Sequence, residues 1–158
     1  MLLEQEIEKK LMDKLTALLD ANGIADKQVY GTLQPDLLKA KEQDCGVLLV
    51  VKVSPRSYSS PTIPTCNIDV TVQLNTRADI DFQGKTYLDV CAVLMEQWEK
   101  WQRCMEDAHE DFTIPDRFTI VGFQLGKGTT AIDGDKTIWQ YTTNFTLFGV
   151  VESQNHNQ

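Results

Sequence analysis

The stretch CNIDVTVQL, residues 66–74, alternates strictly between apolar and polar side chains. Its apolar face is formed by Ile68, Val70, Val72 and Leu74, and its polar face by Asn67, Asp69, Thr71 and Gln73. A period of two is typical of a β-strand that buries one face. The preceding run VLLVVKV, residues 47–53, is apolar up to Lys52, which predicts a central strand covered on both faces.

A long β-hairpin is expected at the carboxyl end. The pattern predicts one strand over Phe118–Leu125, a Gly/Asp/Thr-rich connection over Gly126–Asp135, and a second strand over Thr137–Val151. In the second strand Trp139, Tyr141, Phe145 and Leu147 share one face, and Gln140, Thr142, Asn144 and Thr146 share the other. A shorter strand over Gln28–Leu33 precedes Pro35, after which Leu37-Leu38 begins a possible short helix.

A first helix is predicted from Leu2 to Ala21 and is stopped by Asn22-Gly23. Its apolar stripe is Leu3, Ile7, Leu11, Leu15, Leu18 and Leu19, with Glu4, Glu6, Glu8, Lys9, Lys10 and Asp13 mainly between these positions. We expect the stripe to pack on the domain's own sheet; burial against a partner subunit is the alternative.

A second helix is predicted from Thr86 to Ala108, opened by a capping box of Thr86 and Asp89. Its expected apolar face is Leu88, Cys91, Leu94 or Met95, Trp98, Trp101 or Gln102, and Met105.

The order of elements is helix, strand, strand, helix, strand, strand. This order predicts an α+β fold, a mostly antiparallel sheet of about 4–5 strands with two long helices packed on it and a long C-terminal β-hairpin. Residues 1–151 are expected to form a single domain, and residues 152–158 a polar tail.

The charge balance argues against nucleic-acid recognition. The chain of 158 residues has 15 basic and 23 acidic side chains, a net charge of −8. Such a potential repels DNA and RNA, although it suits a protein that lines a passage for DNA. The amino-terminal MLLEQEIEKK lacks an export signal and Val47–Val51 is too short to cross a bilayer, so we expect folding in a cytoplasm without membrane contact.

The four cysteines, Cys45, Cys66, Cys91 and Cys104, form no CxxC pair, and we expect reduced and mostly buried thiols. Neither His109 nor His156 has Cys or His neighbours at zinc-ligand spacing, and Cys104 with His109 lies on poorly matched helix faces for a nucleophilic pair. The carboxylates Glu106, Asp107, Glu110 and Asp111 are interpreted as a solvated charge run, and Asp133-Gly134-Asp135 as a turn. We therefore expect no metal, no cofactor, no catalytic residue and no enzymatic activity.

The segment GFQLGKGT, residues 122–129, is the motif closest to a phosphate-binding loop. Three residues rather than four separate Gly122 from Gly126, Gly128 precedes Thr129, and no helix follows. The segment is predicted to form the tip of the hairpin instead.

Two exposed regions are the candidates for an interface. The segment SPRSYSSPTIPT, residues 54–65, is predicted to be a long loop in which Arg56 and Tyr58 suit recognition, and a floppy surface loop is the alternative. Lys127, Thr129 and Thr130, at the expected hairpin tip, are the other candidates.

The closing segment FTIVGFQLGKGTTAIDGDKTIWQYTTNFTLFGV, with its W-x-Y-T-x-x-F strand before Phe-Gly-Val, resembles the C-terminal hairpin of the tail-terminator, or tail-completion, proteins of long-tailed bacteriophages. The resemblance implies a homo-oligomeric ring, commonly hexameric, that caps the tail tube and meets the head connector. It further implies a virion protein of the tail or neck, assembled in the host cytoplasm, with a lumen through which the genome passes and no activity as an enzyme.

Two other functions stay open from the sequence. The first is a different neck protein, such as a head-closure or tail-adaptor subunit. The second is a small-molecule-binding module with a cleft near Trp98, Trp101 and Trp139, for which core packing of the three tryptophans is the alternative.

Overall fold

The computed structural model describes residues 1–34, 46–77, 87–132 and 138–152. The strands are β1 (Lys27–Gly31), β2 (Val47–Val53), β3 (Ser57–Tyr58), β4 (Thr65–Arg77), β5 (Phe118–Ile132) and β6 (Ile138–Val151), and the helices are α1 (Leu3–Ala21), α3 (Tyr87–Arg103) and α4 (Met105–Phe112). Within these residues the strands form one six-stranded sheet in the order β1-β2-β4-β6-β5, with β3 paired to β4. Only β1 and β2 run parallel, so the predicted α+β fold with a mostly antiparallel sheet is confirmed.

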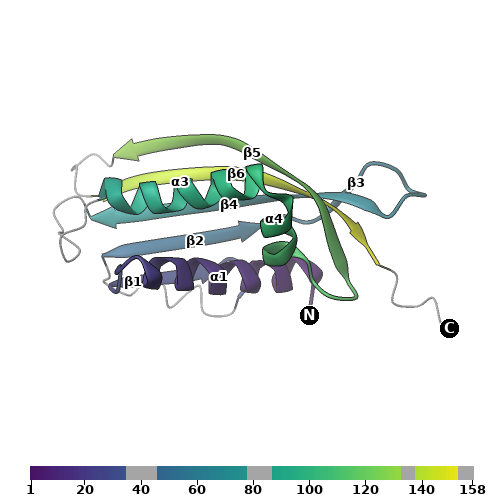
Figure 1. Ribbon diagram of the computed structural model, residues 1–158, viewed down its shortest axis with the longest axis horizontal. Helices are drawn as coiled ribbons and strands as arrows, with labels where there is room; N and C mark the ends of the chain where they lie inside the picture. Colours follow the sequence, from purple (N-terminus) through teal and green to yellow (C-terminus); the bar gives the residue numbers. More distant parts are fainter. Residues whose placement is uncertain (35–45, 78–86, 133–137, 153–158) are drawn as a thin grey trace.

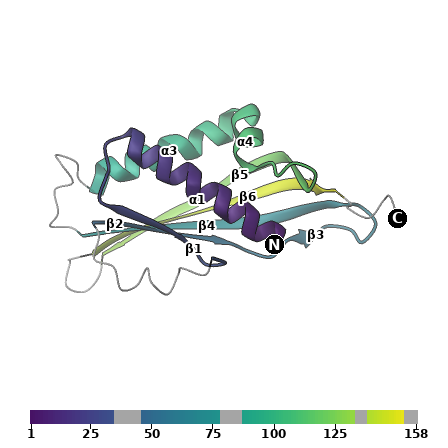
Figure 2. The same cartoon turned by 90° about the horizontal axis from the view of Figure 1, so that it is seen from below.

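The molecule has two layers. Figure 2 shows α1, α3 and α4 on the same face of the sheet, and Figure 1 shows α1 over β1 and β2 and α3 over the long strands. The alternating side chains of β4 explain the arrangement, because Ile68, Val70, Val72 and Leu74 are all buried on the helix side. No helix among the described residues is long and apolar enough to cross a membrane.

An aromatic cluster fills the core between α3, α4 and the hairpin. Its rings, Trp98, Trp101, Phe112, Phe123 and Phe145, lie with neighbouring centroids from 4.6 to 6.0 Å apart. Trp98 and Trp101 are each 1% exposed, so core packing accounts for both side chains. Trp139 is half-buried and packs on Tyr87 at 4.9 Å.

The first helix packs on β1 and β2 of its own sheet, as expected, and Gly23 adopts the left-handed conformation (φ 75°) that ends it. The polar positions of this helix require a correction, because Glu4 and Glu8 are buried rather than solvated. β2 is central, as predicted. The described helices cover only one of its faces, and Leu48 and Val50 on the opposite face are half-buried.

The second predicted helix is wrong in two respects. It is divided at Cys104, which has extended backbone angles, into α3 and α4. Of the expected apolar face, Cys91, Leu94, Trp98 and Trp101 are buried, together with Tyr87, Val90 and Gln97, whereas Leu88 and Met105 are 69% and 39% exposed. The break redirects the chain so that Phe112 contacts Trp101.

The hairpin strands are longer than predicted. β5 continues through Gly126 to Ile132 with register shifts at Ile120/Gly122 and Leu125/Gly128, so GFQLGKGT is a bulged strand and not a hairpin tip. The predicted loop over residues 54–65 also contains a strand, β3, paired to Cys66 and Asn67 of β4. The predictions for Pro35, Leu37-Leu38, Cys45, Thr86, Asp133–Asp135 and the tail after residue 152 lie outside the described residues.

Candidate interface site

Arg56, predicted to be an exposed recognition residue, is held by a carboxylate of α1. Its backbone N–H donates to Glu4 Oε2 at 2.8 Å, and its guanidinium donates to the same carboxylate from Nε at 3.0 Å and from Nη2 at 2.8 Å. Burial works to raise the pKa of Glu4, but the bonds from Arg56 outweigh it and hold that pKa below its usual value. Arg56 therefore ties the start of β3 to α1.

Glu8, one turn along α1, is a fully buried carboxylate. It accepts hydrogen bonds from Leu33 N at 2.7 Å and Thr32 Oγ1 at 3.3 Å, just beyond the end of β1, and from Val53 N at 3.2 Å, at the last residue of β2. Burial raises the pKa of Glu8 above its ordinary value, although these donors act in the opposite sense. A Cβ at Gly31 would overlap the Glu8 carboxylate, so a larger residue there would displace Glu8 from its donors.

We call Glu4, Glu8 and their donors the carboxylate clamp. The clamp joins α1 to the strand ends from which β3 projects, and it satisfies backbone N–H groups that the sheet leaves unpaired. The sequence pattern places both glutamates between the apolar positions of the helix and indicates no partner for them. A signal was present, however, because positions 4, 8, 11 and 15 recur at helical spacing and place Glu4 and Glu8 in line with Leu11 and Leu15.

Tyr58 is exposed, as predicted, at 48% of its surface. It is the last residue of β3, and the chain that follows to Pro64 is exposed at almost every position, with Ile63 at 52%. Figure 1 shows β3 and this connection projecting beyond the helices at one end of the sheet. Residues 57–64 are hereafter called the arm.

Lys127, Thr129 and Thr130 are exposed, but they lie in β5 and not at a hairpin tip. Lys127 occupies the bulge, Thr129 pairs with Thr142 on the face away from the helices, and Thr130 pairs with Tyr141 on the helix side. These three candidates therefore point in different directions.

The five predicted residues do not form one site. Tyr58 pairs with Cys66 of β4, and Cys66 pairs with Gly149 of β6. Thr130 pairs with Tyr141, which lies further along β6. The separation along β6 is about 26 Å at roughly 3.3 Å per residue. The structure thus divides them between the arm and the far part of the hairpin.

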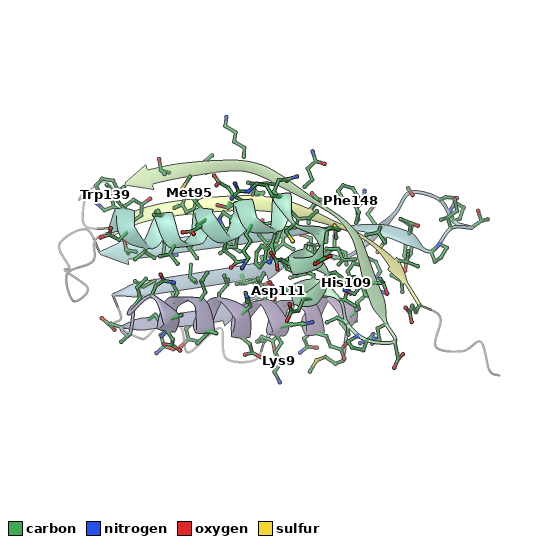
Figure 3. The ribbon with its side chains drawn as sticks, in the orientation of Figure 1. Lys9, Met95, His109, Asp111, Trp139 and Phe148 are labelled. Atoms are coloured by element: carbon green, nitrogen blue, oxygen red, sulfur yellow. The ribbon has the colours of Figure 1, made fainter. Side chains whose placement is uncertain are left out.

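A groove that the sequence did not reveal lies between α3 and β5, with a volume of about 290 Å³. Its lining includes Met95, Trp98 and Glu99 of α3, Leu125 and Thr130 of β5, and Tyr141 of β6. Figure 3 shows the Met95 side chain on the hairpin side of α3. We call it the α3–β5 groove.

Two buried polar atoms of the groove lining have no hydrogen-bond partner within the described residues. They are the indole nitrogen Nε1 of Trp98 and the hydroxyl Oγ1 of Thr143. A buried donor or acceptor without a partner costs about 1–3 kcal/mol, so a group that supplied partners here would be favoured.

The sheet face away from the helices carries small hydrogen-bonding side chains. Thr71 Oγ1 donates to Asn144 Oδ1 and Thr146 Oγ1 donates to Asp69 Oδ1, each at 2.8 Å, between directly paired positions of β4 and β6. The pairs give this face a rigid, polar surface.

The acidic run on α4 is only partly a solvated surface. Asp111 Oδ2 accepts a hydrogen bond from Trp101 Nε1 at 2.7 Å and lies 3.6 Å from Lys14 Nζ of α1. Figure 3 shows Asp111 and His109 on α4 beside α1. Asp111 is therefore part of the packing between α1, α3 and α4.

Burial raises the pKa of the Cys66 and Cys91 thiols, and both cysteines are free and buried, as predicted. Cys104 is free and half-buried.

The fold and these surfaces define a two-layer α+β protein with a projecting arm, a side groove and a long edge hairpin. No protein-family model matches the chain. No curated protein matches it in sequence. A chain from a solved structure of the virion of a native gene transfer agent particle is similar to it, with 17% identity and a TM-score of 0.45 over 88% of this chain and 84% of that chain.

Proposed function

We propose that this chain is a structural tail-completion protein of a phage or prophage. It forms a homo-oligomeric ring that caps the tail tube and joins it to the head connector, and it has no enzymatic activity. The observation that carries the proposal is the C-terminal hairpin, whose sequence resembles that of the tail-terminator family and whose strands span 15 and 14 residues.

The geometry of the hairpin suits assembly. β5 is the last strand of the sheet order, so its outer edge has no strand partner in the described chain. An open strand edge and a flat polar face are surfaces on which a neighbouring subunit or a tube can dock. The net charge of −8 suits a ring whose lumen lets DNA slide without being held.

The test is the mass of the purified chain, followed by its position on tails. Light scattering is expected to give a multiple of the 17.9 kDa chain mass, and electron microscopy of gold-labelled chain mixed with tail tubes from the same strain is expected to show label at one tube end. A chain that stays monomeric and does not bind tubes would contradict the proposal. Label at the head connector without tube binding would favour a head-closure or tail-adaptor subunit.

A further inference from the structure

We infer that the arm of one copy docks in the α3–β5 groove of a second copy, and that this head-to-tail contact joins neighbouring subunits. The inference rests on the proposed function, because it names the surfaces through which the ring would close. Four observations on the arm and the groove support it.

The arm exposes apolar side chains on a projecting element. Tyr58 and Ile63 are 48% and 52% exposed, and Pro61 and Pro64 flank Ile63. Exposed apolar groups on a projection gain stability by burial against a partner.

The groove has the matching chemistry. The buried rings of Trp98 and Tyr141 line the groove together with the half-buried Leu125 and the 46% exposed Met95, so it offers apolar contact to a docked segment. The unpartnered Trp98 Nε1 requires an acceptor and Thr143 Oγ1 either a donor or an acceptor. The arm is rich in carbonyls and in Ser and Thr hydroxyls that supply both.

The charges of the two regions do not oppose each other. The arm, residues 57–64, has no charged side chain, and Arg56 beside it is paired with Glu4. Residues 89–111, which form one wall of the groove and continue through α4, hold seven acidic and two basic side chains. In a chain of net charge −8, these are the segments that two copies can bring together without repulsion.

The arm of a given copy does not reach its own groove. Its base is level with Gly149 of β6, whereas the groove contains Tyr141 and Thr143, about 20–26 Å away at roughly 3.3 Å per residue. Figures 1 and 2 both show the arm directed away from α3. A contact between two different patches is heterologous, and such contacts close into rings when the rotation between subunits permits.

The test uses one variant of each surface in the full-length chain. Ile63→Asp places a carboxylate on the arm, and Met95→Asp places one at the groove. Each is expected to weaken the junction at least about 30-fold, as for an interface hot spot, and to give the monomer mass by light scattering. Ala17→Asp, at an exposed apolar residue of α1 that lies outside the arm, the groove and the edge of β5, is the matched control and is expected to assemble like the unmodified chain.

The decisive result is the mixture of the two variants. The Ile63→Asp copy keeps its groove and the Met95→Asp copy keeps its arm, so an equal mixture has one intact junction per pair and is expected to give a one-to-one dimer. Circular dichroism melts of each variant show whether it is folded. Assembly of either single variant at the unmodified mass, or folded variants that form no dimer when mixed, would overturn the inference and leave the proposed function standing. A monomeric unmodified chain would overturn the inference, and one that also fails to bind tail tubes would overturn the proposed function as well.

Discussion

Glu4 and Glu8 lie one helical turn apart on α1, but their surroundings shift their pKa values in opposite directions. The bonds from Arg56 lower the pKa of Glu4 from its ordinary 4.5, and burial raises that of Glu8 from the same value. Linkage converts each shift into a dependence of stability on pH. The contribution of Glu4 is present above the unfolded pKa and is lost as the pH falls through the lowered folded pKa. The contribution of Glu8 is full below the unfolded pKa and is lost as the pH rises through the raised folded pKa.

The two glutamine variants are therefore expected to differ in the sign of their pH dependence. Urea unfolding between about pH 3 and pH 8 measures the stability of the unmodified chain relative to Glu4→Gln and to Glu8→Gln. Relative to Glu4→Gln, the unmodified chain should gain stability as the pH rises from the acid end. Relative to Glu8→Gln, it should lose stability as the pH rises above about 4.5, the ordinary value. Slopes of equal sign would contradict the environments described for the carboxylate clamp.

The clamp also marks what local sequence patterns can and cannot predict about single residues. A glutamate between leucines on a helix is usually solvated, so nothing in the local pattern distinguishes Glu4 and Glu8 from the other charged positions of α1. Their burial depends on donors at Leu33, Val53 and Arg56, which are 25, 45 and 52 residues distant in the chain. These hydrogen-bond donors can be identified only when the positions of the strand ends in the folded chain are known.

At the scale of elements, α4 is attached to the rest of the fold by Asp111. Trp101 is 1% exposed, and its indole N–H donates to the Asp111 carboxylate at 2.7 Å. Asp111→Ala leaves this buried donor without an acceptor, which should lower the free energy of unfolding by about 2 kcal/mol. Asp111→Asn keeps an acceptor oxygen and loses mainly the attraction to Lys14, so its loss should be less than half as large.

Chemical denaturation with tryptophan fluorescence measures both variants. Glu110→Ala, at the exposed neighbouring carboxylate, is the control and should change stability by no more than about 0.5 kcal/mol. Equal losses for Asp111→Ala and Asp111→Asn would show that charge, rather than the hydrogen bond, holds α4 in place.

Elements with a strong period were predicted well, and elements that depend on partners were not. Val47–Val53 is the strand that its apolar run predicts, because both its composition and its length are local signals. β5 was predicted seven residues too short, since Gly126 and Gly128 favour a turn whereas pairing with β6 continues the strand to Ile132. Gly128 packs under Tyr141, where a Cβ would lie 3.0 Å from the ring. The α3–β5 groove follows from this extension, and for that reason it was not found from the sequence.

At the scale of the whole molecule, the helices and the sheet divide the surface into two kinds. The helix layer carries the acidic segment 89–111, and the opposite sheet face carries polar cross-strand pairs such as Thr71 with Asn144. The proposed ring uses both, because neighbours meet through the arm and groove while the polar sheet face is left for contact with a tube or a lumen. The net charge can be counted from the sequence alone. The assignment of acidic and polar side chains to the two faces of the molecule requires the topology of the sheet.

The net charge gives a prediction that separates a DNA passage from a DNA-binding surface. Proteins that bind nucleic acid without sequence preference release counterions from phosphates, so their affinity rises steeply as salt is lowered. A chain of net charge −8 is repelled by phosphates, and lowering the salt extends that repulsion over a longer Debye length. Fluorescence anisotropy with a labelled 30-base-pair duplex is therefore expected to show no binding at about 0.15 M salt and none at about 0.02 M salt, up to chain concentrations of about 10⁻⁴ M. Binding that strengthens at the lower salt would reveal a basic surface formed on assembly, and would contradict a lumen through which DNA slides freely.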